Sequence, residues 1–482
     1  MERRIFQYAL GLLVGAAVLV SCPSAVSRGG SGVIKVRLGG PSSRGILDAP
    51  AFPIFATATV TVTGPGMTSV TASLVNGSAS LNVPAGDGRV VTVDAVPDWA
   101  ATVAANPTAV PVTHATRYGG SATVDVKSGQ TADLSMNLAV TGTQIVLLSV
   151  GSGAFYFAPS FSEVAGATND FGESDLGVES DFELDQYGRL YLSDWDPTYL
   201  YSIVMRYDGG GSGNPIVTEI LTTEGIPMTR IALDGVKGRL YYVGYYDDNL
   251  EHGSPVGYHD GATGQHVYFD QPANLPGEWD IYQSGLAFRP SIAVDAKGEV
   301  IMPLFDRGPD VENIGDESYY LVKATTGTPY YSADEEGYIA DTTITLSVTY
   351  ANALLNDDSG NPLVIYDMIS LADTVYILLG DVDHDARTRS RGKIVALRSG
   401  NLSNPRSTGW SSSVFPSSPQ TQFYGPARFI GMAQGKLYVA DDGYSSSTTN
   451  ANRVVEVTLD PLSITAVSAV PSDVTFFHEY HP

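Results

Sequence analysis

Short runs of alternating apolar and polar residues fill the chain from residue 33 to about residue 142. Examples lie at 33–38, 58–62, 90–93 and 122–126. Each run is bounded by Gly, Pro or Asn, and no stretch of this region shows a convincing helical period. Strict alternation between turn residues is typical of half-buried antiparallel strands. The pattern therefore predicts an all-β domain at 33–142.

A phrase of two strands joined by a tight turn recurs five times in the rest of the chain. The copies lie at 182–192, 231–243, 292–302, 369–378 and 430–439. An Asp side chain can close such a turn and Gly supplies the positive φ that it needs. The fourth copy lacks the Gly and the fifth lacks the Asp. A further apolar strand follows each copy, at 202–207, 256–259, 319–323, 393–397 and 453–457. Strands repeated in this way are typical of propeller blades.

The repeated phrase resembles that of the NHL-type and related six-bladed propellers, as in Ile292-Ala293-Val294-Asp295. This resemblance implies a β-propeller over 143–482, with six blades expected and five to seven compatible with the length. The sixth blade is expected to join 145–157 to a C-terminal strand at 464–467. A β-sandwich or an irregular β-solenoid remains the alternative.

The first region resembles the prealbumin-like or immunoglobulin-like β-sandwich modules that follow lipoprotein tethers. The motifs that carry this resemblance lie at 83–86, 118–120 and 127–131. The expected fold class is therefore all-β: a small β-sandwich followed by a β-propeller.

The N-terminus has the features of an export signal. Arg3 and Arg4 precede an apolar stretch at 9–20, which is long enough for a signal peptide and too short to span a bilayer. It runs into Leu19-Val20-Ser21-Cys22, which resembles the bacterial lipobox and holds the chain's single cysteine. The resemblance implies cleavage before Cys22 and acylation, with palmitate among the acyl chains. The alternative is an ordinary signal peptide with a chance Cys.

These motifs divide the chain into four parts: a signal peptide at 1–21, a lipidated Cys with a flexible tether at 22–32, a sandwich at 33–142 and a propeller at 143–482. Charge supports the last boundary. Residues 33–142 have a net charge of zero, whereas residues 143–482 have a net charge of −27 and hold 25 of the 27 Tyr residues. Several acyl chains make a lasting anchor, so we expect attachment to the bacterial cell envelope, at the outer membrane or cell surface. The total charge of −25 argues against a nucleic-acid partner, because phosphate contacts require a basic face.

Asp381, Asp383 and Asp385 form the clearest candidate site. Carboxylates at alternate loop positions suit Ca²⁺, and the phrase looks like the start of an EF-hand loop. However, Ala386 stands where that loop needs Gly, and Gly392 stands where it needs Glu. The alternative is a solvated acidic turn that pairs with the arginines at 387, 389 and 391.

Three further groups of residues stand out, and the first two each allow two interpretations. Asp181 and Glu183 end an acidic run and alternate with apolar residues, which predicts the exposed face of a strand, or else a metal or cationic ligand in a central channel. The Tyr-rich segment 241–246 suits either a recognition surface or a half-buried strand. His252, His259 and His266 repeat every seven residues, a spacing that does not place them on one face of a strand.

Catalysis has little support in the sequence. Neither Gly-x-Ser-x-Gly nor His-Glu-x-x-His occurs. The expected function is therefore a membrane-anchored binding or scaffolding lipoprotein whose propeller engages a protein or glycan. The alternative is a metal-dependent, lactonase-like hydrolase acting in the channel.

Overall fold

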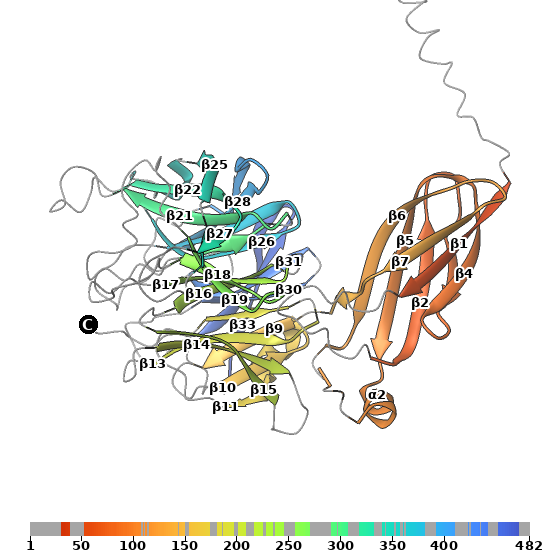
Figure 1. The fold of residues 1–482 in the computed structure, drawn as a ribbon, viewed down its shortest axis with the longest axis horizontal. Helices are drawn as coiled ribbons and strands as arrows, with labels where there is room; N and C mark the ends of the chain where they lie inside the picture. Colours follow the sequence, from red (N-terminus) through yellow and green to blue (C-terminus); the bar gives the residue numbers. More distant parts are fainter. Residues whose placement is uncertain are drawn as a thin grey trace, which may run out of the picture. The chain divides into compact units, whose positions relative to one another are not determined.

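The computed structural model shows an all-β chain that divides into two compact units (Figure 1). It describes residues 30–38, 53–107, 109, 111–112, 115–142, 144–149, 154–173, 181–185, 187–196, 201–208, 216–224, 228–234, 237–244, 256–269, 291–295, 297–306, 318–331, 340–342, 344–350, 353–356, 360, 363–380, 392–409, 423, 426–433, 435–441 and 452–471. The first unit comprises 1–40, 55–97 and 117–139, and the second comprises the remainder. No helix among these residues is long and apolar enough to cross a membrane.

Two sheets form the first unit. Its strands are β1 (Ser31–Leu38), β2 (Phe55–Thr63), β3 (Val70–Ser73), β4 (Ser78–Pro84), β5 (Gly86–Pro97), β6 (Tyr118–Val126) and β7 (Thr131–Met136), with β8 (Ala139–Val140) at its end. One sheet has the order β4-β1-β7 and the other the order β3-β2-β5-β6-β8. β1 is antiparallel to β4 and parallel to β7.

The alternation in the sequence explains why these two sheets pack on each other. Ile34 and Val36 of β1 are fully buried, as are Val60 and Val62 of β2, whereas their strand neighbours reach solvent. One buried charge interrupts this apolar interior. Arg89 donates hydrogen bonds to the carbonyl oxygens of three residues in neighbouring turns: Pro65 at 2.7 Å, Pro84 at 3.2 Å and Ala85 at 2.9 Å.

A short helix was missed by the sequence analysis. α2 (Trp99–Ala105) begins at Asp98, whose carboxylate accepts a hydrogen bond from the N–H of Ala101 at 2.8 Å. Thr102 then accepts a hydrogen bond from the N–H of Ile54 at 2.8 Å. The signal was present in the sequence, because an Asp cap before an Ala-rich stretch favours a helix start.

The second unit contains the remaining strands. They are β9 (Gln144–Ser149), β10 (Ala154–Ala158), β11 (Thr168–Glu173), β12 (Asp181–Leu184), β13 (Leu190–Asp196), β14 (Tyr201–Asp208), β15 (Ile216–Glu224), β16 (Met228–Asp234), β17 (Arg239–Gly244), β18 (Val256–Asp260), β19 (Gln265–Phe269), β20 (Ala293–Val294), β21 (Val300–Asp306), β22 (Ser318–Thr326), β23 (Tyr330–Tyr331), β24 (Ala340–Thr342), β25 (Ile344–Tyr350), β26 (Val364–Leu371), β27 (Thr374–Gly380), β28 (Gly392–Arg398), β29 (Ser403–Ser407), β30 (Pro426–Ala433), β31 (Lys436–Asp441), β32 (Arg453–Leu459) and β33 (Leu462–Ala469). Two short 3₁₀ helices, Phe161–Gly166 and Ala353–Leu355, lie between strands.

All five predicted hairpins are present, each followed by its predicted further strand. The hairpins are β12–β13, β16–β17, β20–β21, β26–β27 and β30–β31, and the further strands are β14, β18, β22, β28 and β32. A fourth strand extends each group, giving the orders β12-β13-β14-β15, β16-β17-β18-β19-β24-β23, β20-β21-β22-β25, β26-β27-β28-β29 and β11-β10-β9-β30-β31-β32-β33.

The turns are closed as the sequence predicted. Asp185 accepts hydrogen bonds through Oδ1 from the N–H groups of Tyr187 at 2.8 Å and Arg189 at 2.9 Å, and Gly188 has a φ of +85°. In the fourth copy, which lacks the Gly, Ala372 takes the positive φ of +53° instead. The same Asp closure occurs at Asp234 and Asp295.

The first strands of these sheets contact one another in sequence order, β12 with β16, β16 with β20, β20 with β26 and β26 with β30. β9 then pairs with β30, and Phe155 of β10 meets Phe182 of β12 edge to face at 6.3 Å. These contacts form a circuit through the five sheets of the second unit, and we call this set of sheets the ring. Its strands carry the colours from yellow to blue in Figure 1. The expected pairing of 145–157 with the strand at 464–467 was wrong. Residues 464–467 belong to β33, which pairs with β32, and β9 joins the ring through β30 instead.

Candidate functional site: the charged layer on the inner strands

One position recurs on the first strand of each hairpin. The position is counted back from the residue of the first strand that pairs with the first apolar residue of the second strand. It lies three residues before that residue in four hairpins, and four residues before it in β30, which has a bulge. The residues at this position are Asp181, Arg230, Ser291, Asp367 and Arg428, and all five are buried. Because the first strands contact one another around the ring, these residues form one layer, in which acidic and basic side chains alternate except at the neutral Ser291.

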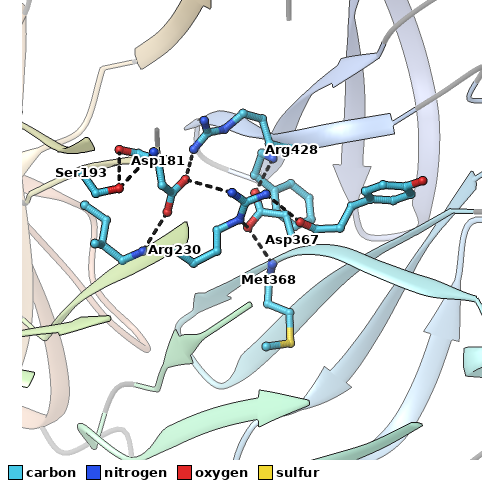
Figure 2. Close-up of polar contacts among 9 residues, drawn as sticks. Asp181, Ser193, Arg230, Asp367, Met368 and Arg428 are labelled. Atoms are coloured by element: carbon cyan, nitrogen blue, oxygen red, sulfur yellow. Dashed lines mark hydrogen bonds and ion pairs between the residues drawn. The ribbon is translucent and has the colours of Figure 1, made fainter. Parts of the chain in front are cut away.

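Four of these side chains point toward one another (Figure 2). Arg428 forms an ion pair with Asp181. Arg230 lies 3.9 Å from Asp181 (Nη1 to Oδ1) and 3.7 Å from Asp367 (Nε to Oδ1). Arg230 also donates a hydrogen bond to the carbonyl oxygen of Tyr366 at 3.0 Å. Two carboxylates thus face two guanidinium groups, so the layer is balanced in charge.

The two carboxylates also connect neighbouring sheets through the main chain. Asp181 on β12 accepts a hydrogen bond from the N–H of Ile231 on β16 at 2.8 Å. Asp367 on β26 accepts one from the N–H of Phe429 on β30, also at 2.8 Å. Hydrogen bonds to an ionised acceptor are stronger than neutral ones. The layer therefore holds the first strands of four sheets in a fixed register.

Burial shifts the pKa values of two residues of this layer, Asp367 and Arg428. Loss of hydration raises the pKa of Asp367, while the Arg230 guanidinium opposes the rise. The same loss of hydration lowers the pKa of Arg428, and the Asp181 carboxylate opposes that fall. The ionised forms of Asp367 and Arg428 are therefore each supported by neighbouring groups of opposite charge.

Glu183 lies two residues further along β12 and is half-buried. Its burial, followed by the nearby charges of Asp181 and Asp367, raises its pKa well above the usual value of 4.5. Arg428 counteracts this rise only in part. Glu183 therefore has a raised pKa although part of its side chain remains exposed.

The structure corrects two expectations from the sequence. Asp181 was expected on an exposed strand face, but only 3% of it is exposed, because β12 contacts β16 of the next sheet and Asp181 accepts a hydrogen bond from Ile231 there. His259 and His266 were expected on different faces, but they lie directly opposite each other on β18 and β19.

The structure decides between the two interpretations of the Tyr-rich segment for Tyr241 and Tyr242. Tyr241 and Tyr242 are fully buried between sheets, so they belong to the core and form no recognition surface. Cys22 and the candidate calcium ligands Asp381, Asp383 and Asp385 lie outside the described residues, as do the histidine at 252 and the tyrosines at 245 and 246.

The sequence analysis missed Arg230, Asp367 and Arg428. Each stands one or two residues before a copy of the repeated phrase, so a recurring polar position was visible in the sequence, but which of these side chains face one another was not. Among the residues that the structure describes, no three His, Cys, Asp or Glu side chains are grouped so that they could hold a metal ion.

Residues 345–482 match the TdpA C-terminal domain family. The match covers β26 to β33 and most of β25. A GH43 endo-arabinanase from Bacillus licheniformis is among the similar solved structures. It is 11% identical, with 60% of this chain and 95% of that chain covered and a TM-score of 0.29. No curated protein sequence matches the chain.

Proposed function

We propose that this protein is an exported, lipid-anchored lipoprotein of the bacterial cell envelope that binds a protein or glycan without chemically changing it. In this proposal the ring of sheets is a six-bladed propeller, in which β9, β10 and β11 form a shorter sixth blade. The sandwich is a spacer between the lipidated Cys22 and the propeller.

The observation that carries the binding role is the charged layer on the inner strands. A carboxylate that acts as a nucleophile or base must be free to approach a substrate. Asp181 and Asp367 instead accept hydrogen bonds from the main chain of the next sheet and face Arg230. These hydrogen bonds and ion pairs stabilise the ring, and in this proposal the ring is a rigid platform for ligand-binding loops.

Replacement of Cys22 tests the anchor. Cys22→Ala should shift the protein from the membrane fraction to the soluble fraction and abolish labelling with palmitate. The expected acyl chains are attached to the sulfur and to the new amino group of Cys22. Ser27→Ala, in the expected tether, is the matched control and should remain in the membrane fraction. A Cys22→Ala protein that still partitions with membranes and takes up palmitate would contradict the anchor.

The soluble Cys22→Ala form then tests the binding role. It is applied to arrays of envelope glycans and peptides, and any retained ligand is recovered and analysed for cleavage. The proposal expects saturable binding with the ligand recovered intact. Turnover of a recovered ligand would contradict the non-enzymatic role.

A hydrolase remains the second candidate, and Glu183 is the observation that favours it. A raised pKa is a property of carboxyl groups that serve as general acids, and Glu183 has it because of its burial and the nearby carboxylates of Asp181 and Asp367. If the ring is an enzyme, Glu183→Gln should abolish turnover while leaving the ligand bound.

A further inference from the structure

The hairpin of β18 and β19 brings two histidines together at the outer part of the second sheet. The register pairs His259 with His266 directly across the two strands. Directly opposed residues project from the same face, with Cβ atoms about 5 Å apart in antiparallel sheets. Both histidines are half-buried, and the turn that follows His259, at 262–264, is exposed. Water and dissolved ions can therefore reach this pair.

A tyrosine fixes the orientation of one of the two rings. The Oη atom of Tyr242 lies 2.5 Å from Nε2 of His266. Tyr242 reaches His266 by passing over Gly257, where a side chain would collide with the phenol. Tyr268 also packs against the His266 ring, with ring centroids 4.4 Å apart. The His266 ring is thus held in place before any ligand arrives.

Both histidines are neutral at neutral pH. Burial, and secondarily the neighbouring His259, lowers the pKa of His266 to about 3. Burial also lowers the pKa of His259, although the Asp260 carboxylate opposes the shift. Neutral imidazole is the form that coordinates a metal ion, so no proton has to be removed before binding.

We propose that His259 and His266 form a binding site for a divalent transition-metal ion such as Zn²⁺, Ni²⁺ or Cu²⁺, with water as the remaining ligands. In the bound form Nε2–H of His266 donates its hydrogen bond to Tyr242, which leaves Nδ1 as the coordinating atom. A metal-ligating histidine usually donates its other N–H to an oxygen, and this arrangement supplies that oxygen. Imidazole ligands favour these metals over Ca²⁺ or Mg²⁺. The inference does not rest on the proposed function.

Titration calorimetry with ZnCl₂ and with NiCl₂ tests the site. The sample is the soluble Cys22→Ala chain, purified without a histidine tag and in a buffer that does not chelate metal. We expect one site per chain. His259→Gln and His266→Gln should each weaken binding at least tenfold, because a single imidazole remains. His252→Gln removes another histidine of the same segment and should leave the affinity unchanged.

Tyr242→Phe tests whether the hydrogen bond that orients His266 contributes to the metal affinity, because the variant keeps both metal ligands. Both imidazoles remain in this variant, but the oxygen that orients His266 is lost, and loss of such a partner costs about 10- to 100-fold in metal affinity. His259→Gln retains the bond between Tyr242 and His266, so it keeps the test valid if His266→Gln fails to fold. Wild-type protein that shows no binding at millimolar Zn²⁺, or binding that survives His259→Gln, overturns the site.

Discussion

The two units of this protein differ in how their buried charged side chains are paired. Among the described residues of the first unit, Arg89 is the single buried charged side chain, and it bonds to main-chain carbonyl groups. The ion pair between Arg117 and Asp94 stands at the surface, with both side chains more than half exposed. In the ring, by contrast, ion pairs such as that of Arg428 with Asp181 are buried between sheets.

The difference follows from what each unit has to specify. In the sandwich, alternation fixes which face of each strand is buried, and a shift of one residue would expose the apolar set. In the ring, the sheets are built from similar hairpins and both faces of each sheet are apolar, so packing alone distinguishes their positions poorly. Buried ion pairs can specify register where apolar packing does not. We infer that the charged layer has this role here.

A second ion pair in the ring has the same character. Lys323 on β22 lies 2.7 Å from Asp295 and 2.6 Å from Glu299 of its own sheet. It also donates a hydrogen bond to the carbonyl oxygen of Ser399, in the sheet of β26 to β29, at 3.1 Å. Polar contacts therefore connect neighbouring sheets of the ring at Lys323 as well as in the charged layer.

The largest effect should come from Arg230→Met. Methionine preserves most of the length of the side chain but leaves Asp181 and Asp367 without the guanidinium between them. Breaking a buried ion pair by removing one partner costs about 3–5 kcal/mol. Urea unfolding followed by circular dichroism should show this loss in the free energy of unfolding of the ring.

Two variants in the sandwich sharpen that result. Ile34→Ala removes a fully buried side chain of β1 and should destabilise only the unfolding step of the sandwich, by about 2–4 kcal/mol. Arg117→Met breaks an exposed ion pair and should leave both steps close to wild type. If Arg230→Met behaves like Arg117→Met, the charged layer is not what distinguishes the ring.

A smaller effect should follow from Gly431→Ala, which tests how the ring closes. A Cβ atom at Gly431 would collide with the carbonyl oxygen of Gln144 and would lie 2.9 Å from Cα of Ile145, both on β9. The pairing of β9 with β30 must then shift, at a cost of about 1–3 kcal/mol. Thermal unfolding measures the loss.

Gly400→Ala is the matched control, because a Cβ atom there meets nothing within 4 Å and the residue has no positive φ. Its melting temperature should equal that of the wild type. Equal melting temperatures for both variants would show that the contact between β9 and β30 adds nothing to the stability of the ring.

Strand positions could be predicted from this sequence, and the charged layer could not. Alternation and turn residues are local features, so the hairpins appear in the pattern of each copy. The layer depends on pairs far apart in the chain; Asp181 and Arg428, for example, are 247 residues apart. No local pattern reveals which of the five sheets lie side by side.

The pattern was also misleading at Asp181. Polar residues that alternate with apolar ones indicate a strand with one wet face. In the ring β12 contacts β16 of the next sheet, so the polar residue Asp181 of this alternation belongs to a buried charged layer. α2 was missed for a different reason, because seven residues are too few to show a helical period.

The smallest effect concerns the protonation of Glu183. Burial raises the folded-state pKa of this acid above its usual 4.5, so the folded protein holds a proton that the unfolded chain releases. The stability of the wild type should therefore fall as the pH rises from about 4.5 through the folded-state pKa. Glu183→Gln has nearly the same shape and cannot ionise, so this contribution should disappear. The free energy of unfolding of the variant relative to wild type should increase across that window and then level off.

Urea unfolding of both proteins at a series of pH values measures this difference. The neighbouring acids Asp181 and Asp367 are present in both proteins, so the comparison isolates the contribution of Glu183. Glu219→Gln, on the exposed side of β15, is the matched control and should follow the wild-type profile. A Glu183→Gln profile that runs parallel to wild type across this window would show that Glu183 is ionised in the fold, and it would then add a charge to the otherwise balanced layer.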